Sequence, residues 1–225
     1  MLTLGPPILP EVDWRSHLAP IRDQGQEGAC TGFATAASRE GALSIHNQTD
    51  LSGYLSPAYL YGRTRIAEGT FPADAGATIA DEMAILQGYG VCPETDLPYN
   101  QNPAEQPTAQ CDVDAKALAI DAALFVEFGN PTNVKQVLSR GMLVVIGFTV
   151  YQSFEETGAD GIVPALRPGE SALGGHGVLV CGYSDSKQHW IVRNQWGTGW
   201  GDHGYCYQPY GYESTWSEAW TYRPQ

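Results

Sequence analysis

Three residues far apart in the chain carry the side chains of a nucleophile, a base and an orienting group. Cys30 lies in QGQEGACTGFA, His176 in LGGHGVLVCGY and Asn194 in IVRNQWGTGWGDHGY. A thiolate beside a protonated imidazole is a strong nucleophile, and a third polar group holds the ring in its productive orientation. Gln24, six residues before the cysteine, adds an amide that can donate to a developing oxyanion together with the Cys30 backbone N–H. The set predicts a thiolate–imidazolium hydrolase.

Four motifs extend this set along most of the chain. VDWR lies near the N-terminus and is followed by the QG-to-Cys segment, the GGH run and NQWGTGWGDHGY. In these motifs and in their order the chain resembles the papain-type cysteine peptidases, from about Val12 to about Tyr207. His176 follows Cys30 by 146 residues and Asn194 follows it by 164, near the family spacing of about 130–150 residues.

The resemblance implies a fold and an activity. The fold is α+β: a papain-like, two-lobed structure in which a helical lobe and a β-barrel-like lobe enclose the active site in a cleft. The activity is that of a cysteine endopeptidase, a thiol protease that hydrolyses protein or peptide substrates without a cofactor. A metal site is not expected, because the chain contains no CxxC or HxxxH spacing.

The resemblance also suggests substrate-binding residues. Gly76 resembles the family glycine that pairs with the extended backbone of a substrate. Ala77, Gly175 and residues near Trp216 are expected to line the specificity pocket. Trp196 is also placed at the substrate site, and it matches the family tryptophan that covers the hydrogen bond between the asparagine and the histidine.

Departures from the family pattern surround the nucleophile. Members usually carry a cysteine three residues before it, in a disulfide that staples the active-site loop, and here that position is Glu27. Thr31 replaces an aromatic residue and Gln195 replaces a serine. The four catalytic candidates are unaffected, so the mechanism is more transferable than the substrate preference. The segment Asp74–Tyr99 resembles prokaryotic members of the family.

The elements that must position these residues change in kind along the chain. Helices are expected over Cys30–His46, Pro57–Glu68 and Thr78–Gly88, and the macrodipole of the first would favour a thiolate at Cys30. After a loop at Pro98–Thr108 come short strand-like segments separated by glycine-rich turns. These segments are Leu143–Val150, Gly177–Gly182, His189–Arg193 and Gly204–Tyr207. One catalytic domain, 1–225, is therefore expected, with a helical lobe over about 14–117 and a β-rich lobe over about 118–225 that includes the N-terminal strand.

Composition excludes some partners. A net charge of −13 and a pI near 4.6 argue against binding to nucleic acid or to an anionic membrane. Neither a membrane span nor a secretion signal is visible, which favours a cytoplasmic protein or one exported without a classical signal peptide. Reduced thiols are then favoured for the remaining cysteines. A disulfide between Cys92 and Cys111 stays open.

Regulation and alternative activities complete the sequence-based hypotheses. The chain begins a dozen residues before VDWR, without the inhibitory propeptide usual in the family. Either a propeptide has been removed, or restraint is expected from elsewhere: a narrow substrate choice, a separate inhibitor, or export as a bacterial toxin whose cleft a cognate immunity protein covers. The same triad can also serve an acyltransferase or deamidase, and a non-catalytic pseudo-peptidase that only binds is a further alternative.

Overall fold

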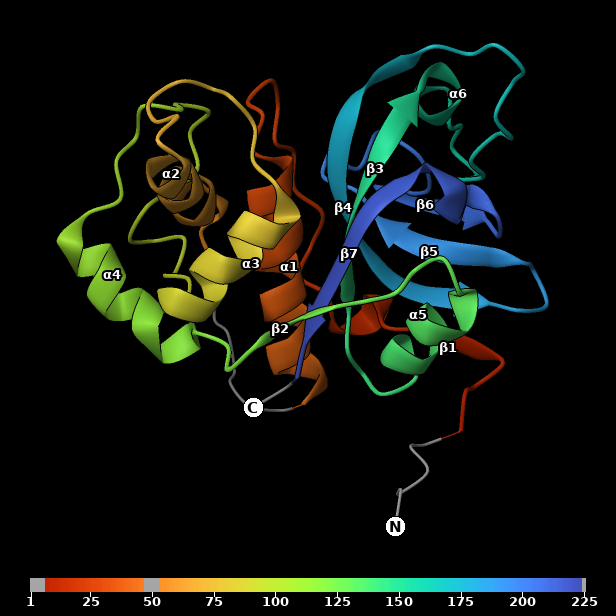
Figure 1. The fold of residues 1–225 in the computed structure, drawn as a ribbon, viewed down its shortest axis with the longest axis horizontal. Coiled ribbons are helices and arrows are strands. Elements are labelled where there is room, and N and C mark those ends of the chain that lie inside the picture. The colour runs from red at the N-terminus through yellow and green to blue at the C-terminus, as the bar shows by residue number, and fades with distance from the viewer. Residues whose placement is uncertain (1–6, 47–52, 224–225) are drawn as a thin grey trace.

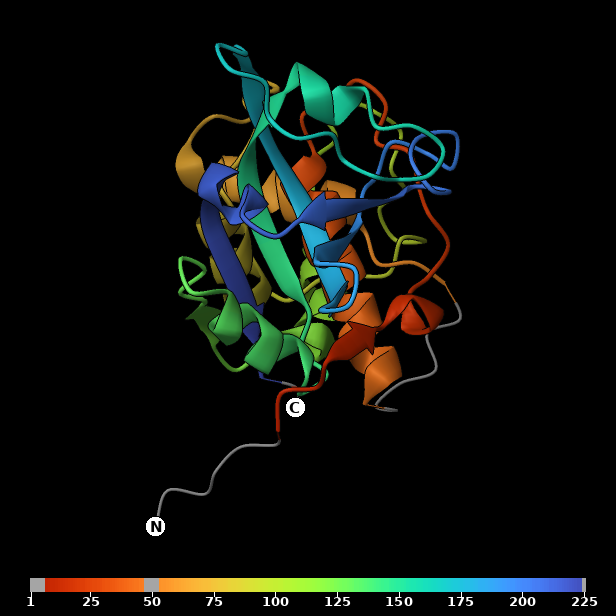
Figure 2. The same ribbon diagram turned by 90° about the vertical axis from the view of Figure 1, so that its right-hand side faces the viewer.

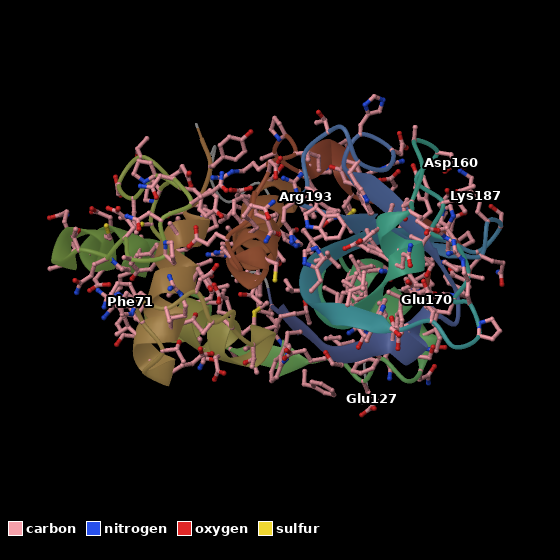
Figure 3. All side chains as sticks on the ribbon, turned by 90° about the horizontal axis from the view of Figure 1, so that it is seen from above. Phe71, Glu127, Asp160, Glu170, Lys187 and Arg193 are labelled. Carbon is pink, nitrogen blue, oxygen red and sulfur yellow. The ribbon has the colours of Figure 1, made fainter. Side chains whose placement is uncertain are left out.

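The computed structural model describes residues 7–46 and 53–223. The first four helices along the chain gather on one side of the molecule, and an antiparallel sheet with two short helices lies on the other (Figure 1). Figure 2, turned by 90°, shows the sheet in front of the helices. In Figure 3, Phe71 just after the second helix and Asp160 and Lys187 on sheet-side loops lie at opposite ends of the molecule. The α+β class expected from the sequence is confirmed.

Local sequence signals account for the helix ends. Ser56, Thr78, Thr108 and Asn130 each precede a helix and accept a backbone N–H of its first turn, the usual role of such residues at an N-cap. Gly69, with φ +75°, ends the second helix. The α-helices are α1 (Cys30–Ile45), α2 (Pro57–Glu68), α3 (Ile79–Gly88), α4 (Ala109–Ala115), α5 (Pro131–Leu138) and α6 (Gln152–Glu155). Short 3-10 turns are formed by Arg15–His17, Lys116–Leu118 and Tyr212–Thr215.

Helix α1 is the central helix of the molecule. Its residues from Thr31 to Leu43 are buried, and many of them are alanine, glycine, serine or threonine, which allows close packing on several sides. It contacts α2 and α3 as well as strands β3 (Val144–Tyr151) and β4 (Ala172–Ser184). Because Cys30 is the first residue of this helix, packing on several sides holds the nucleophile candidate in place.

Within the described ranges, seven strands form one sheet. Besides β3 and β4, they are β1 (Glu11–Asp13), β2 (Ala123–Phe125), β5 (His189–Arg193), β6 (Tyr205–Pro209) and β7 (Trp216–Tyr222). Their order is β2-β7-β3-β4-β5-β6, and β1 pairs with β4. All these pairings are antiparallel. The register of β3 on β4 sets Phe148 opposite His176.

Two large apolar clusters form most of the core. One lies within the sheet half and includes Trp190, Phe148 and Phe154. The other joins α1 and α3 to the sheet, since Met83 of α3 belongs to the same cluster as Leu179 of β4. Apolar burial stabilises by about 25 cal/mol per Å², so the second cluster fixes the helices against the strand that carries His176.

The sequence-based element assignments were right in kind and incomplete in number. α2 and β5 have the predicted bounds, whereas β4 begins at Ala172, earlier than predicted, and so includes the GGH run. Strands β2 and β7 and helices α4, α5 and α6 were not anticipated. They are short, or like β7 they interrupt apolar residues with Ser217 and Glu218, so their periodicity is weak. No helix in the described part of the chain is long and apolar enough to cross a bilayer.

All five cysteines are free thiols in the structure. Cys92 and Cys111 belong to one buried cluster with Tyr59 and Leu97. Burial, with Cys111 beside it, raises the pKa of the Cys92 thiol. Cys181 and Cys206 lie in strands β4 and β6, as their apolar surroundings in the sequence suggested.

Candidate active site

Cys30 opens α1 where the helix meets β4. Among the described residues no side chain caps this helix start, so its first N–H groups are available near the sulfur. The backbone N–H of Gly177, next to His176, faces the Cys30 sulfur and lowers the pKa of the thiol, against the larger, opposite effect of burial. A Cβ at Gly177 would lie 3.3 Å from Cα of Thr31, tighter than most such contacts. The strand and the helix therefore approach closely at this point because position 177 is glycine.

His176 is hydrogen-bonded to Asn194, the residue expected from the sequence to orient it. Its Nε2 lies 2.9 Å from Oδ1 of Asn194, and both side chains are buried. The backbone N–H of Gln195 donates to the same Oδ1 at 2.9 Å, which fixes which end of the Asn194 amide is the oxygen. Since Oδ1 only accepts, the His176 hydrogen lies on Nε2. The neutral ring therefore keeps a lone pair on Nδ1, which can take a proton from a nucleophile.

Aromatic rings cover the histidine. Trp196 stacks on His176 with ring centroids 4.8 Å apart and planes 28° from parallel. Phe148 meets the ring edge-on, with centroids 5.9 Å apart. Trp196 therefore packs against one face of the histidine ring, and its shielding of the bond between His176 and Asn194 stays a prediction.

A cleft of about 670 Å³ lies where the two halves meet. Cys30 and His176 both line it, as do the predicted substrate-binding residues Gly76, Ala77 and Gly175. Ser217 and Glu218, which follow Trp216, also line the cleft, consistent with the pocket expected near that residue. Asn194, Gln24 and Trp196 are not among the lining residues, although Trp196 was expected at the substrate site.

The cleft lining is acidic. Glu68, Asp81 and Glu218 contribute carboxyl groups, and no lysine or arginine occurs in the lining formed by the described residues. Glu218 accepts the backbone N–H groups of Ile79 and Ala80 at 3.0 and 3.1 Å, at the start of α3. A carboxylate is favourable at a helix N-terminus, so Glu218 ties β7 to the helical side across the cleft.

The main chain of Gln24 is held in place by two hydrogen bonds. Its N–H donates to the carbonyl of Gln195 at 2.9 Å, and its own carbonyl accepts the Tyr99 hydroxyl at 2.6 Å. Its side-chain Nε2 donates one hydrogen to the carbonyl of Glu27 at 2.9 Å. An amide nitrogen carries two hydrogens, so the second remains for another acceptor.

Burial favours the neutral forms of both reacting groups. It raises the pKa of the Cys30 thiol, and it lowers the pKa of His176 to about 4. This differs from the expectation that the macrodipole of α1 alone would favour a thiolate, because loss of hydration outweighs the helix N–H groups. A thiolate here therefore depends on an adjacent imidazolium, and the two charges must form together by proton transfer.

Several contributors to the site were not identified from the sequence. Gln195 was noted only as a departure, yet its Nε2 donates to the Gly177 carbonyl at 2.7 Å and lies 3.4 Å from His176 Nε2. Asp74 and Tyr61 support the loop before Cys30 through hydrogen bonds described below. Glu82 is fully buried and accepts the hydroxyl of Thr31, the residue after Cys30, at 3.2 Å. No local motif marks these residues. No group of three or more potential metal ligands is found among residues 7–46 and 53–223.

Comparison with known proteins extends over nearly the whole chain. Residues 8–218 match the family model of papain family cysteine proteases. An uncharacterised peptidase C1-like protein of Acanthamoeba polyphaga mimivirus is 30% identical over 201 residues, covering 84% of this chain and 64% of the relative. Cysteine proteinase 2 of Entamoeba histolytica is 34% identical over 208 residues, covering 86% and 61%. The chain thus spans somewhat under two thirds of these relatives.

Among solved structures, xylellain, a cysteine protease from Xylella fastidiosa, matches with a TM-score of 0.89 and 31% identity. The match covers 97% of this chain and 87% of that one. A cysteine protease of Carica candamarcensis shares the fold, with a TM-score of 0.76 at 21% identity. The papain-like fold expected from the sequence is confirmed, and the chain belongs to the papain family of cysteine proteases.

Proposed function

We propose that the chain is a cysteine endopeptidase that hydrolyses peptide bonds of protein or peptide substrates bound in the cleft. The observation that carries this proposal is the 2.9 Å contact between His176 Nε2 and Asn194 Oδ1. Because the Gln195 N–H fixes the Asn194 oxygen, the base is presented in one tautomer in a cleft that it shares with Cys30.

In the proposed reaction Cys30 gives its proton to Nδ1 of His176 and its sulfur attacks the carbonyl carbon of the scissile bond. The Cys30 N–H and the second amide hydrogen of Gln24 stabilise the oxyanion. His176 then protonates the leaving amine as the thioester forms. Water, deprotonated by His176, attacks the thioester, releases the acid and restores the thiol. Asn194 orients the ring throughout.

The substrate backbone is proposed to lie against Gly76 and Gly175. Both line the cleft, and no atom outside their neighbouring residues lies within 4 Å of where a Cβ would stand on either. An extended peptide would therefore meet bare backbone on both walls. Ala77 would face the specificity pocket, while Trp196 supports the site from behind His176.

The division into lobes at about residue 117 or 118 belongs to the same proposal. It is supported by the element order, since α1 to α4 precede this point, β2 to β7 follow it, and β1 joins β4. A macromolecule that restrains the enzyme would have to cover the cleft between Cys30 and His176. An inhibitor or immunity protein of a delivered bacterial toxin would act in this way.

Mass spectrometry after incubation with a protein substrate tests the proposed activity. New N-termini that are absent with Cys30→Ala and His176→Ala support proteolysis. Isopeptides or a gain of one dalton support the acyltransferase or deamidase, and tight binding without turnover supports the pseudo-peptidase. Iodoacetamide or an epoxysuccinyl peptide should label Cys30, while Cys206→Ala, which removes a fully buried thiol, should leave the labelling unchanged.

A further inference from the structure

Two side chains hold the peptide unit between Glu27 and Gly28, in the loop that leads into Cys30. Its carbonyl, from Glu27, accepts Nε2–H of Gln24 at 2.9 Å. Its N–H, from Gly28, donates to both carboxylate oxygens of Asp74, at 3.0 and 3.1 Å. A rotation of this unit would break both sets of bonds. The plane of the peptide therefore fixes Gln24, the proposed oxyanion donor, relative to Asp74.

Asp74 continues the connection to the opposite wall of the site. The Tyr61 hydroxyl donates to Asp74 Oδ1 and accepts the backbone N–H of Gly76 at 3.0 Å. Tyr61 lies in α2 and is fully buried, with the Arg65 guanidinium 3.8 Å from its ring centroid. Its hydroxyl is thus a fixed point between the carboxylate and the glycine proposed to bind the substrate backbone.

The close approach of Asp74 and Tyr61 to this loop depends on glycine at position 28. A Cβ there would lie 3.0 Å from Asp74 Oδ1 and 3.4 Å from the Tyr61 oxygen, so a larger residue would push the carboxylate away. The connection also lies in the loop where the family usually has a disulfide and where this chain has Glu27. A carboxylate that accepts N–H and O–H groups forms strong, charge-assisted hydrogen bonds.

We propose that Asp74 and Tyr61 are positioning residues that couple the oxyanion side of the cleft to its substrate-binding wall. The inference rests on the proposed peptidase function. Asp74 holds the loop that carries Gln24 and leads into Cys30. The Tyr61 hydroxyl, bonded to both Asp74 and the Gly76 N–H, fixes Gly76 relative to that loop. Neither residue touches the reacting atoms. Loss of Asp74 should lower kcat, and loss of the Tyr61 hydroxyl should raise KM.

The test compares Asp74→Ala, Tyr61→Phe and the double variant with Tyr59→Phe as the matched control. Tyr59 is another buried tyrosine of α2, and its hydroxyl donates to Asp112 at 2.8 Å. Neither Tyr59 nor Asp112 lines the cleft. We expect Asp74→Ala to lower kcat by about tenfold or more and Tyr61→Phe to raise KM several-fold, from the usual worth of such bonds. The fold loss of kcat/KM in the double variant should be smaller than the product of the losses in the two single variants. Tyr59→Phe should have the kinetic constants of the wild type.

Amide hydrogen exchange in the Cys30→Ala protein gives a readout besides turnover. Exchange at Gly28 and Gly76 should be about tenfold faster or more in Asp74→Ala and in Tyr61→Phe, and unchanged in Tyr59→Phe. Kinetic constants within twofold of wild type overturn the positioning role, even where exchange accelerates. If the wild-type protein has no turnover, the proposed function fails, and exchange at the two glycines alone decides whether the coupling exists.

Discussion

The Asn194→Ala variant tests the orientation of the base most directly. In the wild type, Asn194 Oδ1 is the acceptor for His176 Nε2–H. The alanine variant leaves this N–H facing a buried space, since Asn194 is 0% exposed and His176 is 7% exposed. An unsatisfied buried donor costs about 1–3 kcal/mol. At roughly 1.4 kcal/mol for each factor of ten, kcat/KM should fall by about 5- to 150-fold.

The pH profile separates orientation from general damage. The Asn194 oxygen stabilises the imidazolium and raises the pKa of His176 against the larger, opposite effect of burial. Removing the oxygen should therefore lower that pKa further. Since an imidazolium is needed to protonate the leaving amine, the alkaline limb of the kcat/KM profile should move to lower pH.

Gln195→Ala is the matched control for this experiment. It removes the amide that donates to the Gly177 carbonyl but keeps the backbone N–H that fixes Asn194 Oδ1. One neutral hydrogen bond contributes about 0.5–1.5 kcal/mol, so Gln195→Ala should lower kcat/KM by less than Asn194→Ala does. The alkaline limb of its kcat/KM profile should stay in place. Steady-state kinetics with a fluorogenic peptide between about pH 4 and pH 10 measure both effects. An Asn194→Ala enzyme within twofold of wild type, or one no worse than Gln195→Ala, would refute the orientation argument.

Four further outcomes are expected. Gln24→Ala should lower kcat by about 100- to 1,000-fold with little change in KM, and an unchanged kcat would assign the oxyanion to other groups. Burial raises the pKa of Glu82 from 4.5 to about 8, so its contribution to stability is present below pH 4.5 and lost as the pH rises through about 8. In thermal unfolding experiments, the free energy of unfolding of Glu82→Gln should accordingly rise relative to that of the wild type from about pH 5 to about pH 8, by at most about 1.4 kcal/mol per pH unit. Parallel plots of the two free energies against pH would contradict this. Because Glu68 and Asp81 line the cleft, peptides containing arginine should be cleaved faster than matched glutamate peptides. That preference should be reduced in Glu68→Gln and Asp81→Asn and by high salt, and equal rates at low salt would rule it out. Wild-type protein expressed in a bacterial cytosol should slow growth and Cys30→Ala should not, whereas harmless expression of an active enzyme would favour a narrowly specific housekeeping peptidase.

The sequence by itself determined the identity and order of the proposed catalytic residues, because each lies in a motif whose neighbours are informative. The GGH run, the NQWG run and the QG-to-Cys spacing needed no coordinates to indicate a papain-like protein. Helix α2 was also predictable from local signals, since Ser56 caps its start, Pro57 follows and Gly69 ends it. Capping and turn conformations depend on residues a few positions apart.

Only the tertiary structure determined how the site is held. Asp74 meets Gly28 across 46 positions of sequence, and Glu218 reaches the start of α3 across 139, so no local pattern could connect them. The low pKa of His176 likewise follows from burial, which depends on how the sheet packs on α1 and its neighbours. Such contacts form only when distant segments fold together, and their hydrogen bonds and desolvation are properties of that packing.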